Sequence, residues 1–219
     1  MKKDVYRLAA IAAVLIAGML IVAAYYIRAQ KAERAEAVAK QARDNAAVFV
    51  RPHSRGFGPA NAKVTVVEFL DPECESCRAM FPFVKRLLAQ YDGRVRLVVR
   101  YMPFHPNSSY AVSALEAAGE QGRFAEMLET LFVNQPLWGD HHAPKPELIP
   151  EFARQIGLDM VSFGRSLNSS AHKAILETDL ADGKKLGVTG TPTFFVNERL
   201  LEPLEYETFL ALIEDELAK

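Results

Sequence analysis

The sequence predicts an α/β domain preceded by one N-terminal transmembrane helix and a helical stalk. Three observations lead to this fold class. Apolar runs rich in β-branched residues indicate buried strands at residues 64–69, 94–102 and 193–196. Segments between and after these runs carry apolar residues at three- and four-residue spacing, which indicates helices. An uninterrupted apolar run at residues 8–27 has the length of about 20 residues that a membrane-spanning helix needs.

Residues 1–28 are interpreted as an uncleaved signal-anchor. Lys2, Lys3 and Arg7 form a basic start that a cleaved secretory signal peptide would share. The apolar run is longer than the about 7 to 15 residues of such a peptide, and the nearest small-x-small pattern follows only at residues 35–37. Cleavage nevertheless remains an alternative. Positive charges flank the run on both sides, so they do not settle its orientation.

Residues 29–57 are expected to form a helical stalk and a linker. Residues 30–47 are rich in Ala, Glu, Lys, Arg and Gln and lack Gly and Pro, a composition that favours a helix. Large apolar residues are almost absent and no heptad pattern is present, so a solvated spacer is favoured over a dimerising coiled coil. Two prolines and two glycines at residues 51–62 end the helix before the folded domain.

The rest of the chain is expected to be one globular domain with a long helical block. Half of the residues are apolar, 24% are charged and the net charge is −1, which suits such a domain and gives no sign of a nucleic-acid partner. Glycines, prolines and polar turns separate the expected helices. These helices lie at residues 77–90, 109–120, 124–134, 146–156, 160–167, 171–185 and 204–217.

The two cysteines of the chain, Cys74 and Cys77, are its main candidates for chemistry. A disulfide across two intervening residues closes too short a loop to stabilise the fold, and no further Cys or His pair completes a zinc site. Cys74 falls where the first strand gives way to a helix, and a helix N-terminus stabilises a thiolate. Cys77 lies one turn further on, within reach of a mixed disulfide on Cys74. The neighbouring Glu73 and Glu75 disfavour the thiolate.

Four motifs resemble those of the DsbA-type thiol:disulfide oxidoreductases in sequence and in order: VVEFLDPECESC, RYMPFHPNS, AAGEQGRFAEMLETLF and GVTGTPTFFVN. The resemblance covers about residues 58–219 and implies a thioredoxin-like fold with an inserted helical subdomain at about residues 107–187. It implies that Cys74 is the attacking, substrate-linked thiol and Cys77 the resolving one. It also implies a cis peptide at Thr191-Pro192, beside the cysteines, where the backbone binds an extended substrate.

The same resemblance assigns Glu68, six residues before Cys74, as a buried acid that takes a proton from Cys77. Burial would raise the pKa of such a carboxyl group, as proton transfer near neutral pH requires. Strand alternation alone leaves an outward-facing Glu68 as an alternative.

The function implied is disulfide formation in cysteine-containing secreted or envelope proteins, with a redox partner that recycles the pair and with no metal or organic cofactor. Glu75-Ser76 between the cysteines, where the family's archetype has Pro-His, and Thr191 before the proline depart from the strong oxidant. A disulfide isomerase or reductase therefore remains open, as does a tethered chaperone or binding module with a non-catalytic disulfide. We expect a single-pass protein of the inner membrane with its domain on the periplasmic or other extracytoplasmic side, where disulfides persist.

Histidines and the single tryptophan are expected to have structural roles. His141 and His142 follow Asp140 in a polar loop without an evident ordered carboxylate partner, so solvated side chains are favoured over a metal site. His105 lies in a proline-rich turn after the second strand and is expected to support structure. Trp138 is expected in the core.

Overall fold

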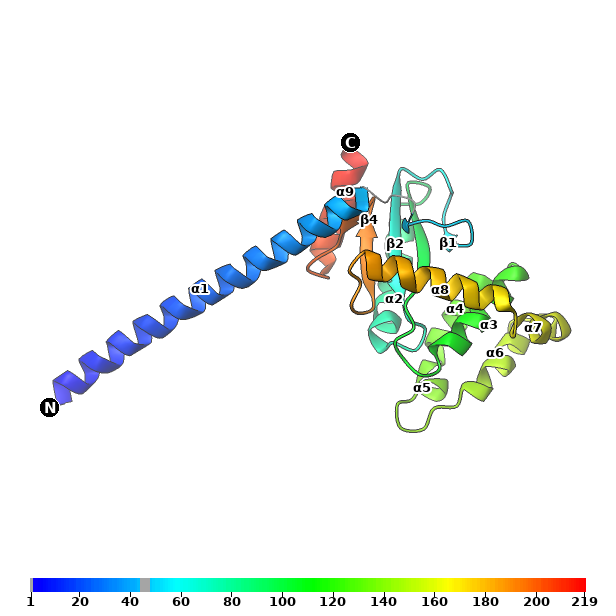
Figure 1. Ribbon diagram of the computed structural model, residues 1–219, viewed down its shortest axis with the longest axis horizontal. Helices are drawn as coiled ribbons and strands as arrows, with labels where there is room; N and C mark the ends of the chain where they lie inside the picture. Colours follow the sequence, from blue (N-terminus) through cyan, green and yellow to red (C-terminus); the bar gives the residue numbers. More distant parts are fainter. Residues whose placement is uncertain (1, 44–47) are drawn as a thin grey trace.

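The structure, a computed structural model, describes residues 2–43 and 48–219, and the side chains of residues 15–41 and 48–219. A long helix, α1 (Lys2–Arg43), projects from an α/β domain (Figure 1). The strands are β1 (Arg55–Phe57), β2 (Val64–Leu70), β3 (Val95–Tyr101), β4 (Thr193–Val196) and β5 (Arg199–Leu200). The helices of the domain are α2 (Glu75–Gln90), α3 (Ser108–Glu120), α4 (Phe124–Val133), α5 (Gln135–Trp138), the 3-10 helix η2 (Pro146–Leu148), α6 (Ile149–Gln155), α7 (Met160–Ser166), α8 (Ser170–Lys185) and α9 (Tyr206–Ala218).

The five strands form one mixed sheet in the order β1-β3-β2-β4-β5. The pair β2 and β3 is parallel, and β4 lies antiparallel on the other side of β2, with Glu68 opposite Phe194. The short strands β1 and β5 pair antiparallel at the two edges. The chain therefore leaves the middle of the sheet at the end of β2 and enters α2 directly.

Apolar side chains cover both faces of the sheet. On one face, residues of β2 and β3 such as Val66 and Val99 pack with α2, α9 and the helical block between β3 and β4. On the other face, Val67, Val98 and Phe195 pack against the end of α8 and the chain that follows α1. Burial on both faces explains why the sequences of the central strands are nearly continuous apolar runs.

The expected α/β architecture and helical insertion are confirmed, with element ends within a few residues of the prediction. The short elements β1, α5 and β5 were not predicted. Each has four residues or fewer, which is too short to show a hydrophobic period. Strand β1 lies in the stretch that the sequence analysis interpreted as a linker, and it pairs with β3 through residues such as Arg55 opposite Val99.

The expectation of a fully solvated stalk is wrong at its C-terminal end. Val38 of α1 is buried against the domain, and Arg34 donates to the carbonyl of Gly187 at 3.3 Å and to the hydroxyl of Thr189 at 3.2 Å. One valine in a charged helix carries no periodic signal, so sequence alone could not place this contact. Residues 44–47, at the end of the expected stalk helix, lie outside the described residues.

No helix is both long and apolar enough to cross a membrane within the part of the chain that was described. The side chains of residues 8–14, which begin the predicted span at residues 8–27, lie outside that part. The membrane span thus stays a prediction.

Candidate active site at Cys74 and Cys77

The two cysteines occupy the turn and the first helical turn that follow β2. Cys74 is the N-cap residue of α2, with an extended backbone, and its N–H donates to the carbonyl of Asp71 at 3.1 Å. Both thiols are free. Cys74 keeps 8% of its surface exposed, whereas Cys77 is fully buried. Both cysteines are thus buried, but Cys74 keeps a small exposed fraction and Cys77 keeps none.

Thr191 and Pro192 lie beside Cys74, as the resemblance implied. Their peptide bond is cis, and the Cys74 thiol donates to the Thr191 carbonyl at 3.4 Å. The pKa of Cys74 is lowered to about 5, first by the hydrogen bond from Cys77 and then by those from the Thr191 side chain and from the backbone N–H groups at the start of α2, against the opposing effect of burial. A pKa of about 5 favours the thiolate of Cys74 at neutral pH.

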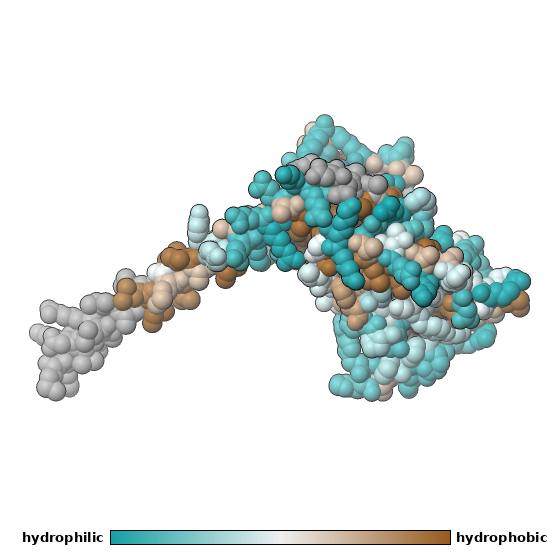
Figure 2. Space-filling view, in the orientation of Figure 1, coloured by the Kyte–Doolittle hydropathy of each residue, from teal (hydrophilic) through white to brown (hydrophobic). Residues whose placement is uncertain are grey.

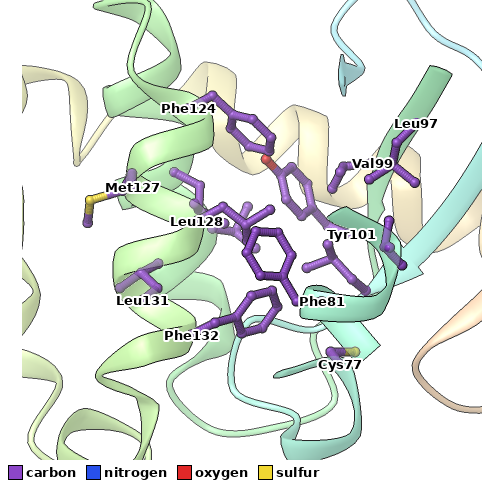
Figure 3. Close-up of a cluster of buried hydrophobic side chains, with 14 of the residues drawn as sticks. Cys77, Phe81, Leu97, Val99, Tyr101, Phe124, Met127, Leu128, Leu131 and Phe132 are labelled. Carbon is purple, nitrogen blue, oxygen red and sulfur yellow. The ribbon is translucent and has the colours of Figure 1, made fainter. Parts of the chain in front are cut away.

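Cys77 has the opposite environment. It lies on α2 at the border of the buried cluster that contains Phe81 and Phe132 (Figure 3). Burial, followed by the hydrogen bond with Cys74 and the charge of Glu68, raises the pKa of the Cys77 thiol far above its usual range. Cys77 thus keeps its proton until a base removes it.

Glu68 is 2% exposed and lies in the sheet on the α2 side, because it shares that face with Val66 and Leu70. The outward-facing alternative is excluded by this burial. Among the described residues Glu68 forms no ion pair. Burial first, and the nearby charge of Cys74 second, raise its pKa to about 8.

Asp71 is a residue of the site that the sequence analysis did not identify. Its buried carboxylate accepts from the backbone N–H of Glu73 at 2.8 Å, from the hydroxyl of Ser108, from the backbone N–H of Phe104 at 2.7 Å and from Nδ1 of His105 at 2.7 Å. These bonds fasten the cysteine turn to the loop after β3. An acid directly after a buried strand and before a proline was the available signal, because such an acid often caps a turn.

The two glutamates beside Cys74 are both held by other groups. Buried Glu73 accepts from the backbone and the side-chain amide of Asn107, each at 2.7 Å. The exposed Glu75 pairs with His141, with 2.7 Å between Oε1 and Nε2. The pKa of Glu75 is lowered, first by its own backbone N–H and then by the bond to His141.

His141 is exposed, as expected, but the expectation that it lacks a carboxylate partner is wrong, because it pairs with Glu75. The pairing crosses from the loop after α5 to the start of α2, a proximity that no local pattern encodes. Glu75, His105 and His141 offer potential metal ligands within 4.8 Å of one another. His142 is exposed and lies outside this group. Trp138 is buried, as expected, and its Nε1–H donates to the Leu131 carbonyl at 2.8 Å.

A family model described as thioredoxin matches residues 51–215. Among solved structures, a thioredoxin-like oxidoreductase from Silicibacter pomeroyi is 28% identical, with a TM-score of 0.67 over 78% of this chain and 96% of that one. BdbD from Bacillus subtilis in its oxidised form is 26% identical, with a TM-score of 0.67 over 76% of this chain and 94% of that one.

Several relatives of known name are ion transporters. A Na(+)/H(+) antiporter NhaA of Herminiimonas arsenicoxydans is 36% identical over 158 residues, which are 72% of this chain and 24% of that protein. The chain thus spans about a quarter of the length of such relatives, and ion transport is named for those proteins alone. The match to the family model and the two oxidoreductase structures instead agree with the cysteine geometry. The chain belongs to the thioredoxin family, among its DsbA-type thiol:disulfide oxidoreductases.

Proposed function

We propose that this chain forms disulfides in extracytoplasmic proteins, with Cys74 as the thiol that bonds to the substrate and Cys77 as the thiol that resolves the bond. The observation that carries the proposal is the contrast between the two thiols. Cys74 is the N-cap residue of α2 and keeps 8% of its surface exposed, whereas Cys77 is 0% exposed. A substrate thiolate can therefore reach one sulfur of the oxidised pair and not the other.

The exchange runs in two steps that balance. A substrate thiolate attacks Cys74 in the Cys74–Cys77 disulfide, forms a mixed disulfide and expels Cys77 as a thiolate that takes up a proton. A second substrate thiolate then attacks the substrate sulfur of the mixed disulfide and expels Cys74 as a thiolate. The substrate loses two electrons and gains a disulfide, and the reduced pair returns its electrons to a disulfide-bearing redox partner. Because a low-pKa thiol is the better leaving group, the environment of Cys74 favours the second step.

Glu68 is positioned to manage the proton of Cys77. Its carboxyl group is buried, and its charge affects the pKa of the Cys77 thiol. A pKa of about 8 allows Glu68 to hold a proton at neutral pH and to exchange it with the nascent Cys77 thiolate. We assign Glu68 this proton-transfer role.

Substrate would lie across the Thr191-Pro192 loop. A cavity of about 380 Å³ adjoins this loop and is bordered on its other side by Lys31 and Arg34 of α1. An extended peptide there can hydrogen-bond to the Thr191 backbone next to Cys74. We therefore assign Thr191 and Pro192 to substrate binding.

The oxidising direction is favoured by the stabilised Cys74 thiolate, because a stable reduced form makes a disulfide a stronger oxidant. The negative Glu75 acts against this, which keeps isomerisation or reduction as the competing activity. Equilibrating the full chain with glutathione buffers decides between them. We expect a potential near the oxidase value of about −120 mV, and a value near about −270 mV would assign a reductase. The double variant with both cysteines replaced by serine is the negative control, because it cannot exchange disulfides.

We also propose that α1 tethers the domain to the inner membrane with the domain on the extracytoplasmic side. Large apolar side chains of α1 are exposed around the helix between Leu15 and Ile27 (Figure 2), an arrangement that suits lipid better than water. Cell fractionation with an alkaline carbonate wash tests the tether. The full chain should stay in the membrane pellet, and a chain without residues 1–28 should not. Recovery of the full chain in the soluble fraction would refute the tether.

A further inference from the structure

We propose that Glu75, His105 and His141 bind one divalent transition-metal ion of the zinc type at the mouth of the active site. The three side chains come from the start of α2, the loop after β3 and the loop after α5. Their potential ligand atoms all lie within 4.8 Å of one another. The inference goes beyond disulfide exchange and does not depend on it.

The chemistry of the donor set selects the class of ion. Two imidazoles and one carboxylate are a common ligand set of zinc sites that leave a fourth position open. Magnesium and calcium prefer oxygen ligands alone, so imidazoles select against them. Zinc–ligand bonds of about 2.0–2.2 Å hold two ligands at most about 4.4 Å apart. Glu75 and His141 are exposed at the rim, so a small rotation of their side chains is enough to close on an ion.

A buried second layer already orients one of the ligands. The Nδ1 of His105 is hydrogen-bonded at 2.7 Å to Asp71, whose carboxylate is fully buried and held by the backbone of Glu73 and Phe104. This bond places the proton on Nδ1 and leaves the lone pair of Nε2 for a metal. A carboxylate behind a ligating histidine is the usual support of zinc-bound imidazole.

The loop that carries His141 is also ordered. The Asp140 carboxylate accepts from the backbone N–H groups of His142 and Ala143, each at 2.8 Å. The rings of His105 and His141 lie 5.5 Å apart between their centroids, with their planes tilted by 44°. Two imidazoles and a carboxylate from three separate segments thus converge at one point.

Binding of Zn²⁺ to the oxidised full chain, purified without a polyhistidine tag, tests the site. In this form the Cys74–Cys77 disulfide cannot supply a thiolate ligand. Isothermal titration should show one Zn²⁺ per chain, and Glu75→Gln and His141→Ala should each weaken the binding at least about 10-fold. His142→Ala, at the neighbouring exposed histidine, is the matched control and should bind like the parent chain.

Chemical modification of the unaltered chain gives a second readout that needs no variant to fold. Zn²⁺ should protect His105 and His141 from diethylpyrocarbonate, and His142 should react as before. Absence of Zn²⁺ binding by the oxidised chain would overturn the proposal. So would binding that persists in both variants, or binding that requires the reduced chain and is lost in Cys74→Ser, since that result places the ion on the thiols.

Discussion

Two sites of buried carboxylates, one on each face of the sheet, differ in whether a cation accompanies them. On the face away from α2, Asp179 and Asp182 of α8 meet the buried Arg100 of β3, with oxygen–nitrogen distances of 2.8 and 2.7 Å. Arg51 adds a two-bond pair to Asp182. On the face toward α2, Glu68 lies buried beside the cysteines without an ion pair among the described residues.

The two sites differ in the pKa values of their carboxyl groups. Burial acts to raise the pKa of Asp182, but the hydrogen bonds from Arg51 and Arg100 outweigh it and hold that pKa below its usual range. Glu68 has no such compensation, so its pKa rises to about 8. A buried carboxylate with cations contributes to the fold, whereas a buried carboxylate without them is available for proton transfer near neutral pH.

The largest expected effect is a loss of stability when the ion pairs on the face away from α2, which we call the paired face, are broken. Arg100→Met removes the buried cation that Asp179 and Asp182 share, which should lower the free energy of unfolding by about 3–5 kcal/mol. Urea unfolding measures this loss. Lys85→Met is the matched control, because its pair with Glu129 is exposed and should cost about 1 kcal/mol or less. Equal losses in the two variants would contradict the structural role of the paired face.

Glu68→Gln should slow exchange without breaking the fold. The amide keeps the shape of the carboxyl group but cannot accept the proton of Cys77, so attack by Cys77 should slow by about 100-fold, at the low end of acid–base contributions. Stopped-flow fluorescence of the reduced chain mixed with oxidised glutathione measures the step. An unchanged rate across neutral pH would remove Glu68 from the mechanism.

The pH dependence of stability should report Glu68 directly. In the folded, reduced chain Glu68 keeps its proton up to about pH 8, whereas in the unfolded chain it releases it above its ordinary pKa of 4.5. At Glu68 the folded state binds more protons in this window, so this group should make stability fall as pH rises from about 4.5 to about 8, by up to about 1.4 kcal/mol per pH unit. The lowered pKa of Cys74 acts in the opposite direction, so the fall should appear in the difference between the parent chain and Glu68→Gln. If Glu68→Gln shows the same dependence of stability on pH as the parent chain, the dependence belongs to another group.

The smallest expected effect concerns the link between the thiols. The hydrogen bond from Cys77 is the largest influence that lowers the pKa of Cys74, so Cys77→Ala should move that pKa from about 5 toward its usual range. Cys77→Ser, which retains a donor, should shift it less. Thiolate absorbance against pH, with a chelator present, follows the titration. Equal pKa values in the parent and in Cys77→Ala would show that Thr191 and the helix terminus stabilise the thiolate without Cys77.

The sequence could predict what is encoded locally. Long apolar runs placed β2, β3 and β4, and apolar spacing placed the helices, because burial imposes a period on residues close in the chain. The cysteine motif is also local, and Pro192 was found because short motifs in the right order resemble those of a known family.

Tertiary contacts could not be predicted. The pairing of Glu75 with His141 joins residues 66 apart, and that of Asp71 with His105 joins residues 34 apart. The docking of Arg34 on Gly187 spans 153 residues. A side-chain pair of this kind leaves no periodic trace in either segment. The burial of Glu68 likewise depends on which face of β2 the helix α2 covers.

Trapping of mixed disulfides in cells tests the exchange mechanism most directly. The full chain with Cys77→Ser should accumulate adducts with cysteine-containing proteins, bonded through Cys74 and released by a reductant, because the resolving thiol is gone. The chain with both cysteines changed to serine should form none. Absence of adducts with Cys77→Ser, or adducts of equal yield with Cys74→Ser, would contradict the assignment of Cys74 as the reactive thiol.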